Sequence, residues 1–417
     1  MPMKSESFTR RSFLKTSTAA AGGALLGALS IERSAFAAAN NDTLKIALVG
    51  CGGRGTGAAD HALTADSNCK LVAMADAFQD RLDTSFKNIK NKHGDRVDVP
   101  EEHKFVGFDA FKHAIELADV VILATPPGFR PMQFEEAVRK GKHIFMEKPV
   151  AVDAPGVRRV LAAAEEAKKK NLKVGVGLQR HHQPNYIETV KRLQDGAIGD
   201  IVAARVYWNG GPVGPKYRRA QVAGMLGRAP TEMEFQMRNW YMFNWLCGDH
   251  IVEQHIHNQD VISWIKGKYP VRAQGMGGRA YQSGPDSGEI FDHHAVEYEF
   301  DDGTRMFSQC RQIPNCENNV SEHVIGTHGT ADVSGHKIFG PNAWRYKKEG
   351  QSNNGWQLEH YSLFDAIRND KPYNEAENGA KSTLVAIMGR MATYSGKVIE
   401  FDKALNSTVD LMPKHLA

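Results

Sequence analysis

The stretch that decides the fold is Leu44-Lys45-Ile46-Ala47-Leu48-Val49-Gly50-Cys51-Gly52-Gly53-Arg54-Gly55-Thr56-Gly57. It begins as an apolar run, which predicts a buried strand, and it ends in a turn dense in glycine. Gly50, Gly52 and Gly55 have the spacing G-x-G-x-x-G, which lets the chain turn tightly, approach a pyrophosphate and start a helix close to the sheet. The helix N-terminus would offer N–H groups and a positive dipole end to the phosphates.

Glycine-rich turns are common, so this pattern needs support from its surroundings. A second apolar run, Lys70 to Asp76, ends in an acid about 20 residues further on, which is where a dinucleotide-binding fold places one. Asp76 would accept hydrogen bonds from the adenosine ribose, and its charge would repel a 2′-phosphate. We therefore expect NAD rather than NADP, the alternative for Asp76 being an ordinary turn aspartate.

Length and composition fit a globular protein of two domains. The chain has 417 residues, 41% hydrophobic and 24% charged, which excludes disordered and collagen-like classes. Its net charge is +4, of which the first 37 residues supply +3, so the remainder carries only +1. The charged residues of that first segment are Lys4, Glu6, Arg10, Arg11, Lys15, Glu32 and Arg33. No basic excess remains to indicate nucleic acid as a partner.

The N-terminus has the features of a twin-arginine export signal. Arg10 and Arg11 precede an apolar segment from Thr16 to Ile31, and Ala35-Phe36-Ala37 gives a cleavage site after Ala37. An amphipathic helix or a membrane anchor are the alternatives, but the segment is shorter than the roughly 20 residues of a span. We expect a periplasmic protein without an anchor. Because the periplasm has no dependable pool of free NAD, we also expect the cofactor to be retained or exchanged slowly.

The five cysteines do not predict a disulfide framework. Their number is odd and no C-x-x-C pair occurs, so unpaired thiols are expected, with a Cys310–Cys316 bridge as the alternative.

Strand and helix patterns alternate as far as residue 180. Apolar runs over Ala118 to Thr125, Lys142 to Met146 and Leu172 to Leu178 predict parallel strands, and Ala154 to Lys170 is one of the helices between them. This alternation predicts a Rossmann-type, doubly wound parallel sheet. The expected division of the chain is a signal peptide over 1–37, a nucleotide-binding domain over 42–180 and a substrate-binding and oligomerisation domain over 181–417.

The second domain is expected to be an α+β domain with an open, largely antiparallel or mixed sheet. A single helix is expected from about Gly248 to Trp264, whereas Asn209 to Met237 is rich in glycine and proline and has little pattern. The expected strands are Ile201–Trp208, Val271–Tyr281, His294–Phe300, Arg305–Arg311 and Glu322–Ile325, and the last helices are Glu359–Ile367 and Ala380–Ser395.

Several motifs resemble the family named for glucose-fructose oxidoreductase, inositol dehydrogenase and the rhizopine-catabolism dehydrogenase (Gfo/Idh/MocA). They are the glycine turn, Ala124-Thr125-Pro126, Glu147-Lys148-Pro149 after a strand, the Arg180 region, Gly196-Ala197-Ile198-Gly199 and the helix from Glu253 to Asp260. The resemblance covers nearly all of the chain after the signal. It implies two domains, NAD or NADP, a sugar or polyol substrate and self-association.

The resemblance also assigns site residues. His257 matches the catalytic histidine and would act as general base on a sugar hydroxyl, while Lys148 would stabilise the developing alkoxide. Glu253, where the family has aspartate, would orient His257 or touch the substrate, and His255 stands where the family has glycine. The expected cofactor contacts are Gly50, Gly52, Gly53, Arg54, Gly55, Asp76, Thr125, Pro126, Arg130, Glu147 and Lys148. The expected substrate contacts are Arg180, Tyr241 and Asp260.

Two further possibilities concern the helix from Gly248 and the reaction. His250, Glu253 and His257 have the types and spacing to hold a divalent metal, but we expect them to be hydrogen-bonded rather than metallated. The expected activity is hydride transfer between a sugar or glycoside ring hydroxyl and tightly held NAD. The alternatives are an NAD-dependent glycoside hydrolase acting by oxidation and elimination, and a non-catalytic sugar-binding module.

Overall fold

The computed structural model describes residues 42–348, 350 and 352–415. The predicted signal peptide and its cleavage site after Ala37 lie outside these residues.

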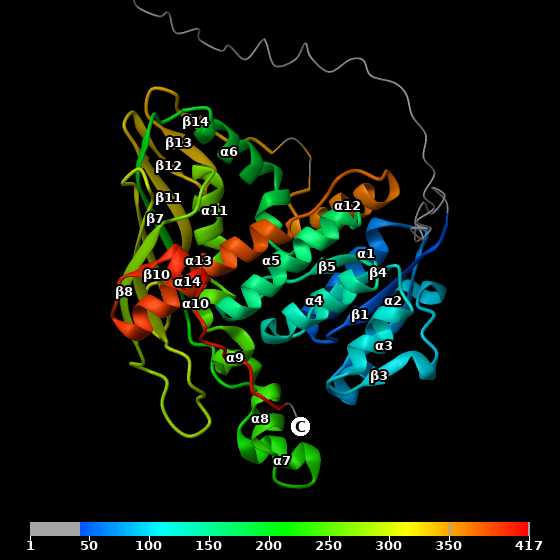
Figure 1. The fold of residues 1–417 in the computed structure, drawn as a ribbon. Coiled ribbons are helices and arrows are strands. Elements are labelled where there is room, and N and C mark those ends of the chain that lie inside the picture. Colours follow the sequence, from blue (N-terminus) through cyan, green and yellow to red (C-terminus); the bar gives the residue numbers. More distant parts are fainter. Residues whose placement is uncertain (1–41, 349, 351, 416–417) are drawn as a thin grey trace, which may run out of the picture. The chain divides into compact units, whose positions relative to one another are not determined.

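The first sheet has six parallel strands in the order β3-β2-β1-β4-β5-β6 (Figure 1). The strands are β1 (Leu44–Val49), β2 (Cys69–Asp76), β3 (Lys104–Val106), β4 (Val120–Leu123), β5 (His143–Met146) and β6 (Val174–Val176). The chain leaves β1 in one direction and β4 in the other, so a crevice forms at the carboxyl ends of these strands. The predicted doubly wound sheet is confirmed.

Helices from the first half of the chain cover this sheet. They are α1 (Gly53–Ala65), α2 (Gln79–His93), α3 (Ala110–Glu116), α4 (Arg130–Arg139) and α5 (Ala154–Lys169), with short 3-10 turns at Gly94–Arg96, Glu101–His103 and Pro127–Phe129. α5 begins as its sequence indicates, because Asp153 accepts a hydrogen bond from the Gly156 N–H at 2.8 Å.

A helix from late in the chain completes the cover. α12 (Gly355–Arg368) packs against α1, and Figure 1 shows the two side by side. Leu363 and Phe364 enter the core beneath β1 and β5, and the His360 ring lies 4.2 Å from that of Phe145. A segment expected in the second domain therefore belongs to the core of the first.

The second sheet has nine strands in the order β14-β13-β12-β11-β7-β10-β9-β8-β15. β7 and β10 are parallel and the other neighbours antiparallel, so the predicted mixed sheet is confirmed. The strands are β7 (Ile201–Gly210), β8 (Arg272–Gly278), β9 (His293–Glu299), β10 (Arg305–Gln312), β11 (Asn319–Gly326), β12 (Gly329–Asp332), β13 (Lys337–Phe339), β14 (Trp344–Arg345) and β15 (Ile399–Glu400). α11 (Ile256–Lys266) and α13 (Ala376–Ser395) pack on one face of it.

The segment between β7 and α11 differs from the expectation. The single helix predicted from Gly248 to Trp264 is wrong, because α10 (His250–Glu253) ends before α11 begins. At the break His255 is fully buried, and its Nε2 lies 2.8 Å from Ser308 Oγ on β10. The segment from Asn209 to Met237, in which the sequence shows little pattern, contains α7 (Arg219–Leu226) and nearly all of α8 (Glu232–Arg238).

α8 starts with a capping box formed by Thr231 and Glu234. The remaining elements are α6 (Pro184–Gln194), α9 (Asn244–Cys247), α14 (Phe401–Leu405), and 3-10 turns at Gln179–His182 and Trp240–Met242.

The cysteines are as expected from the sequence. All five thiols are free, four of them buried and Cys316 exposed, which confirms the unpaired state. Among the described helices, none combines the length and apolar character needed to cross a bilayer.

Buried neutral histidines make stability depend on pH. Burial lowers the pKa of His143 to about 4 and that of His255 to about 3. In the unfolded chain both would titrate near 6.5, so below that pH the unfolded state binds more protons. Their contribution is complete above pH 6.5 and is lost as the pH falls.

We expect each of these two histidines to lower the free energy of unfolding by about 2 kcal/mol between pH 6.5 and 5. Urea unfolding at several pH values measures this. His255→Gln should have a shallower dependence on pH than the wild type, and equal slopes for the two proteins would contradict the expectation.

Candidate active site

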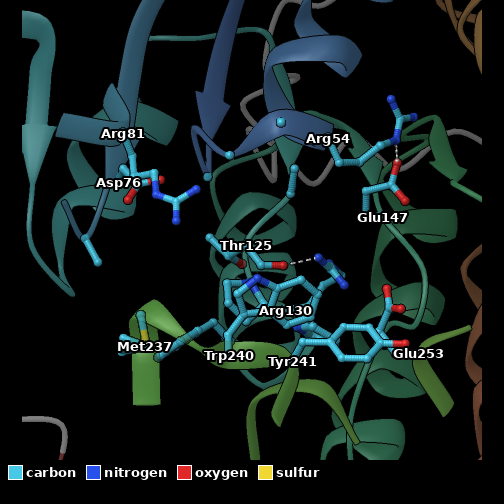
Figure 2. Close-up of a pocket in the computed structure, with 18 of the residues that line it drawn as sticks. Arg54, Asp76, Arg81, Thr125, Arg130, Glu147, Met237, Trp240, Tyr241 and Glu253 are labelled. Atoms are coloured by element: carbon cyan, nitrogen blue, oxygen red, sulfur yellow. Dashed lines mark hydrogen bonds and ion pairs between the residues drawn. The ribbon is translucent and has the colours of Figure 1, made fainter. Parts of the chain in front are cut away.

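A cavity of about 740 Å³ lies at the carboxyl ends of the strands of the first sheet (Figure 2). One wall is formed by the turns that follow β1, β2, β4 and β5. The opposite wall comes from the second domain, mainly from the segment from Met237 to His257, with Trp208 of β7 and the loop residues Val213, Gly214 and Lys216. The site is therefore built between the two sheets.

The glycine turn after β1 brings three backbone segments together. Gly50 has a φ of +97°, and a Cβ there would lie 2.6 Å from the Ala124 carbonyl carbon and the Thr125 nitrogen. A Cβ on Gly55 would lie 1.8 Å from the Gly50 oxygen. Only glycine fits at these two positions, and their close approach aims the N-terminus of α1 into the cavity.

The first turn of α1 is open to the cavity and has no acidic residue. Atoms added as Cβ at Gly52 or Gly53 would meet nothing within 4 Å. This open cradle of backbone N–H groups at a positive helix end suits a pyrophosphate.

Asp76 closes the other side of the glycine turn. Its Oδ2 accepts a hydrogen bond from the Cys51 N–H at 2.7 Å, and its Oδ1 accepts one from the Phe78 N–H at 2.9 Å. Burial raises the pKa of Asp76, while these hydrogen bonds and the charge of Arg81 lower it. Both side chains line the cavity, and Figure 2 shows them across it from Arg54.

Lys148 and Glu253 form an ion pair between the two walls. Lys148 Nζ donates to the Glu253 backbone oxygen at 2.5 Å and lies 3.1 Å from its Oε1. Both side chains are about 11% exposed. Lys148 follows β5 and Glu253 ends α10, so this pair fixes the first sheet against the second domain.

His257 lies on α11 beside this pair and lines the cavity. Its ring stacks on that of Trp208, with centroids 6.0 Å apart, and its buried Nδ1 has no hydrogen-bond partner among the described residues. Burial lowers the pKa of His257 well below its usual value, and the charges of Lys148 and Arg180 lower it further. The imidazole is therefore neutral at neutral pH and able to accept a proton.

Arg130 holds two turns of the first wall in place. It is 1% exposed, donates to the Pro149 oxygen at 2.5 Å and also donates to the Thr125 oxygen. Burial lowers its pKa to about 10. Thr125 Oγ1 in turn donates to Gln133 Oε1 at 2.6 Å. Arg130 thus lies under the cavity with its guanidinium committed to backbone carbonyls.

Comparison with known proteins agrees with this architecture. Residues 44–177 match the family model described as GFO_IDH_MocA, oxidoreductase family, NAD-binding Rossmann fold. This segment is similar to the NAD-binding domain that the family model describes. Its open glycine cradle fits the NAD that the family description names.

Curated relatives are similar over part of their length. Inositol 2-dehydrogenase of Rhizobium meliloti (strain 1021) is 28% identical over 200 residues, 48% of this chain and 55% of the relative. 2,7-Anhydro-N-acetylneuraminate hydratase of Escherichia coli (strain K12) is 26% identical over 192 residues, 45% of this chain and 44% of the relative. The chain thus spans about half the length of these two relatives.

Solved structures share the fold of both domains. The crystal structure of aldose-aldose oxidoreductase from Caulobacter crescentus, complexed with glycerol, superposes with a TM-score of 0.66 at 21% identity. The match covers 86% of this chain and 99% of the other. At this identity the likeness concerns the fold.

The structure brings most of the predicted site residues to the cavity. Beside the glycine turn and the Lys148 pair, Pro126, Glu147 and Tyr241 line it. The Tyr241 hydroxyl accepts a hydrogen bond from Gln312 Nε2 at 2.9 Å. Of the two roles expected for Glu253, pairing with His257 is not seen, because Glu253 contacts Lys148, and Glu253 Oε2 and His257 Nδ1 have no partner among the described residues.

Arg180 and Asp260 do not line the cavity. Arg180 forms an ion pair with the buried Glu322. Asp260 is 2% exposed, lies 2.7 Å from His181 Nε2 and accepts a hydrogen bond from Ser382 at 2.7 Å. Their substrate contact stays a prediction that this geometry does not support.

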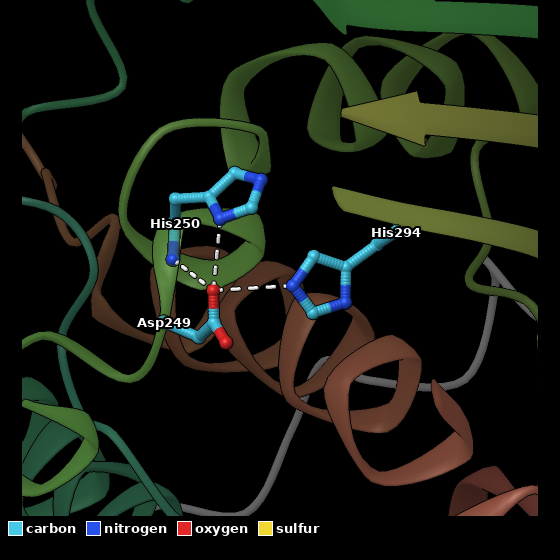
Figure 3. Close-up of side chains that lie close together, drawn as sticks. All are labelled: Asp249, His250 and His294. Atoms are coloured by element: carbon cyan, nitrogen blue, oxygen red, sulfur yellow. Dashed lines mark hydrogen bonds and ion pairs between the residues drawn. The ribbon is translucent and has the colours of Figure 1, made fainter. Parts of the chain in front are cut away.

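The three residues considered for a metal are not brought together. Among the described residues, His250 has ligand-like spacing with Asp249 and His294 and not with Glu253 and His257. Its Nδ1 lies 2.9 Å from Asp249 Oδ1 (Figure 3). The same oxygen lies 3.1 Å from His294 Nε2, which makes Asp249, His250 and His294 a buried group with ligand-like spacing. Asp249 Oδ2 also accepts hydrogen bonds from the Tyr394 hydroxyl and the Phe291 N–H. These bonds tie α10 to β9 and α13.

Sequence reasoning missed residues that the tertiary structure delivers to the cavity. Trp356 comes from the first turn of α12, and Lys216 comes from the segment that lacked pattern. Glu359 was missed as well, although it contacts Arg54 directly. No local signal marks them, because each reaches the site from an element distant in the chain.

Asp76→Ser tests the nucleotide end of the cavity. We expect NAD binding to weaken roughly 10- to 100-fold, since a hydrogen bond to a charged group is lost, while the neighbouring Arg81 lets NADP bind relatively better. Calorimetric titration with both nucleotides measures this. Asp83→Ser, the same change on α2 outside the cavity, is the control. An unchanged NAD-to-NADP ratio in Asp76→Ser would contradict the assignment.

Proposed function

We propose that this protein is an NAD-dependent oxidoreductase that transfers a hydride between the ring carbon of a sugar, polyol or glycoside and the nicotinamide. The observation that carries the proposal is that one cavity holds a pyrophosphate cradle together with a Lys148–Glu253 pair and a neutral His257. A nucleotide held at one side and a proton acceptor at the other are the two requirements of alcohol oxidation.

The chain's own residues would divide the reaction as follows. His257 removes the hydroxyl proton in oxidation and returns it in reduction. Lys148 donates hydrogen bonds to the oxygen and stabilises the alkoxide as the C–H bond breaks. Glu253 holds the ammonium in place. NAD, when bound, supplies the hydride acceptor.

The substrate class rests on the relatives and on the walls of the cavity. One relative is named an inositol 2-dehydrogenase. Trp208 and Tyr241 line the cavity, and aromatic faces suit the C–H surfaces of ring polyols.

We also propose that the protein is exported by the twin-arginine route and retains its NAD. The motif around Arg10 and Arg11 supports export. A purified protein without nicotinamide and with fast release of added NAD would contradict retention.

A panel of inositols, sugars and glycosides, mixed with enzyme and NAD, tests the activity. Absorbance of reduced nicotinamide is expected to rise with at least one ring polyol. Release of aglycone from aryl glycosides without an added acceptor would instead indicate oxidation followed by elimination. Ligand binding without either signal would indicate a binding module.

His257→Asn is expected to lower kcat about 10²- to 10⁴-fold because the general base is lost, with little change in NAD affinity. In the wild type, the acidic limb of kcat/KM should fall below the ordinary histidine value of about 6.5, since the pKa of His257 is lowered. His113→Asn, on the outer side of α3, is the control. Equal kcat in the two variants would remove His257 from the mechanism.

A further inference from the structure

The start of α12 is fixed at the edge of the cavity. A Cβ on Gly355 would lie 2.5 Å from the Gln179 oxygen, so the helix begins in close contact with the turn that follows β6. Trp356 then lines the cavity, and Glu359, one turn later, points toward α1. A segment from the end of the chain therefore meets the nucleotide helix at its first turn.

Arg54, in the first turn of α1, lies between two carboxylates. Figure 2 shows its ion pair with Glu147. Its Nε is 2.5 Å from Glu147 Oε1, and its Nη2 is 2.9 Å from Glu359 Oε1. Glu359 is 1% exposed. Burial raises the pKa of Glu359, and the charge of Glu147 adds to this. A second buried carboxyl group at this place is unfavourable for stability, unless its contact with the Arg54 guanidinium is required.

Glu147 is held on its other side by Gly177. A Cβ on Gly177 would lie 2.6 Å from Glu147 Oε2, so only glycine leaves room for this carboxylate. The next residue is Lys148, whose ammonium reaches Glu253. If the Arg54 side chain moved, Glu147 would therefore move with it. The backbone of the next residue, Lys148, would then shift as well.

The docking of α12 has an independent anchor at its other end. Arg368 lies 2.6 Å from Asp66, and it donates to the backbone oxygens of Asn68 at 2.8 Å and Asp42 at 2.7 Å. For docking alone, an apolar side chain at position 359 would serve as well as a buried acid. The acid is explained by its contact with Arg54.

We propose that Glu359 is a positioning residue of the active site. Together with Glu147 it fixes the side chain of Arg54 at the first turn of α1, where the pyrophosphate would bind, and through Glu147 it sets the place of Lys148. This inference rests on the proposed NAD-dependent function.

Glu359→Leu and Glu359→Gln separate positioning from packing. The leucine variant keeps the volume but loses the acceptor for Arg54, and we expect a 10- to 100-fold lower kcat and several-fold weaker NAD binding, without a lower unfolding temperature. The glutamine variant keeps an acceptor oxygen and should restore both values to near wild type. NAD affinity is measured by calorimetric titration, and kcat with the polyol that the panel identifies.

Two further variants make the test decisive. Arg368→Ala, the matched control on the same helix, should lower the unfolding temperature and leave kcat and NAD affinity unchanged. Gly177→Ala displaces Glu147 without touching α12 and should reproduce the loss of kcat, which keeps the inference testable should Glu359→Leu not fold.

Wild-type values in Glu359→Leu, an equal defect in Glu359→Gln, or an equal defect in Arg368→Ala would each overturn the positioning role. Absence of NAD binding by the wild-type protein would instead overturn the proposed function itself.

Discussion

The ion pair between Lys148 and Glu253 is the interaction on which the site depends. It joins residues 105 positions apart, one at the end of a strand in the first sheet and one at the end of a short helix in the second domain. Buried ion pairs add little to stability, because the loss of hydration offsets much of the attraction. What this pair provides is a fixed distance between the two walls, with the ammonium directed into the cavity beside His257.

Two arginines near this pair hold the residues on either side of Lys148 in place. Arg130 ties the turn after β4 to the oxygen of Pro149, next to Lys148. Arg54 ties the glycine turn to Glu147 on the other side of Lys148. A lysine held from both neighbouring residues has little freedom, and this preorganisation is what charge stabilisation in a reaction requires.

The parts of the site formed by residues close together in the chain could be predicted from the sequence. The glycine turn and Asp76 are close in the chain, and the steric limits that define the motif hold wherever a strand leads into a helix. Lys148 and His257 were identified through motifs that keep their local geometry. The apolar runs likewise predicted most of the strands of both sheets, but not the short strands β12, β13, β14 and β15.

The errors share a physical cause. The single helix expected from Gly248 is broken where His255 and His250 each direct one ring nitrogen to a partner outside α10 and α11, Ser308 on β10 and Asp249. Periodicity within the segment does not register such contacts. The sequence by itself determined the nucleotide turn, the parallel sheet and the chemical types at the catalytic end, because these follow from local sterics and from the pattern of burial. Only the tertiary structure decided that Glu253 pairs with Lys148, that Asp260 is enclosed, and that α12 brings Glu359 to Arg54, because such contacts depend on which distant surfaces pack together.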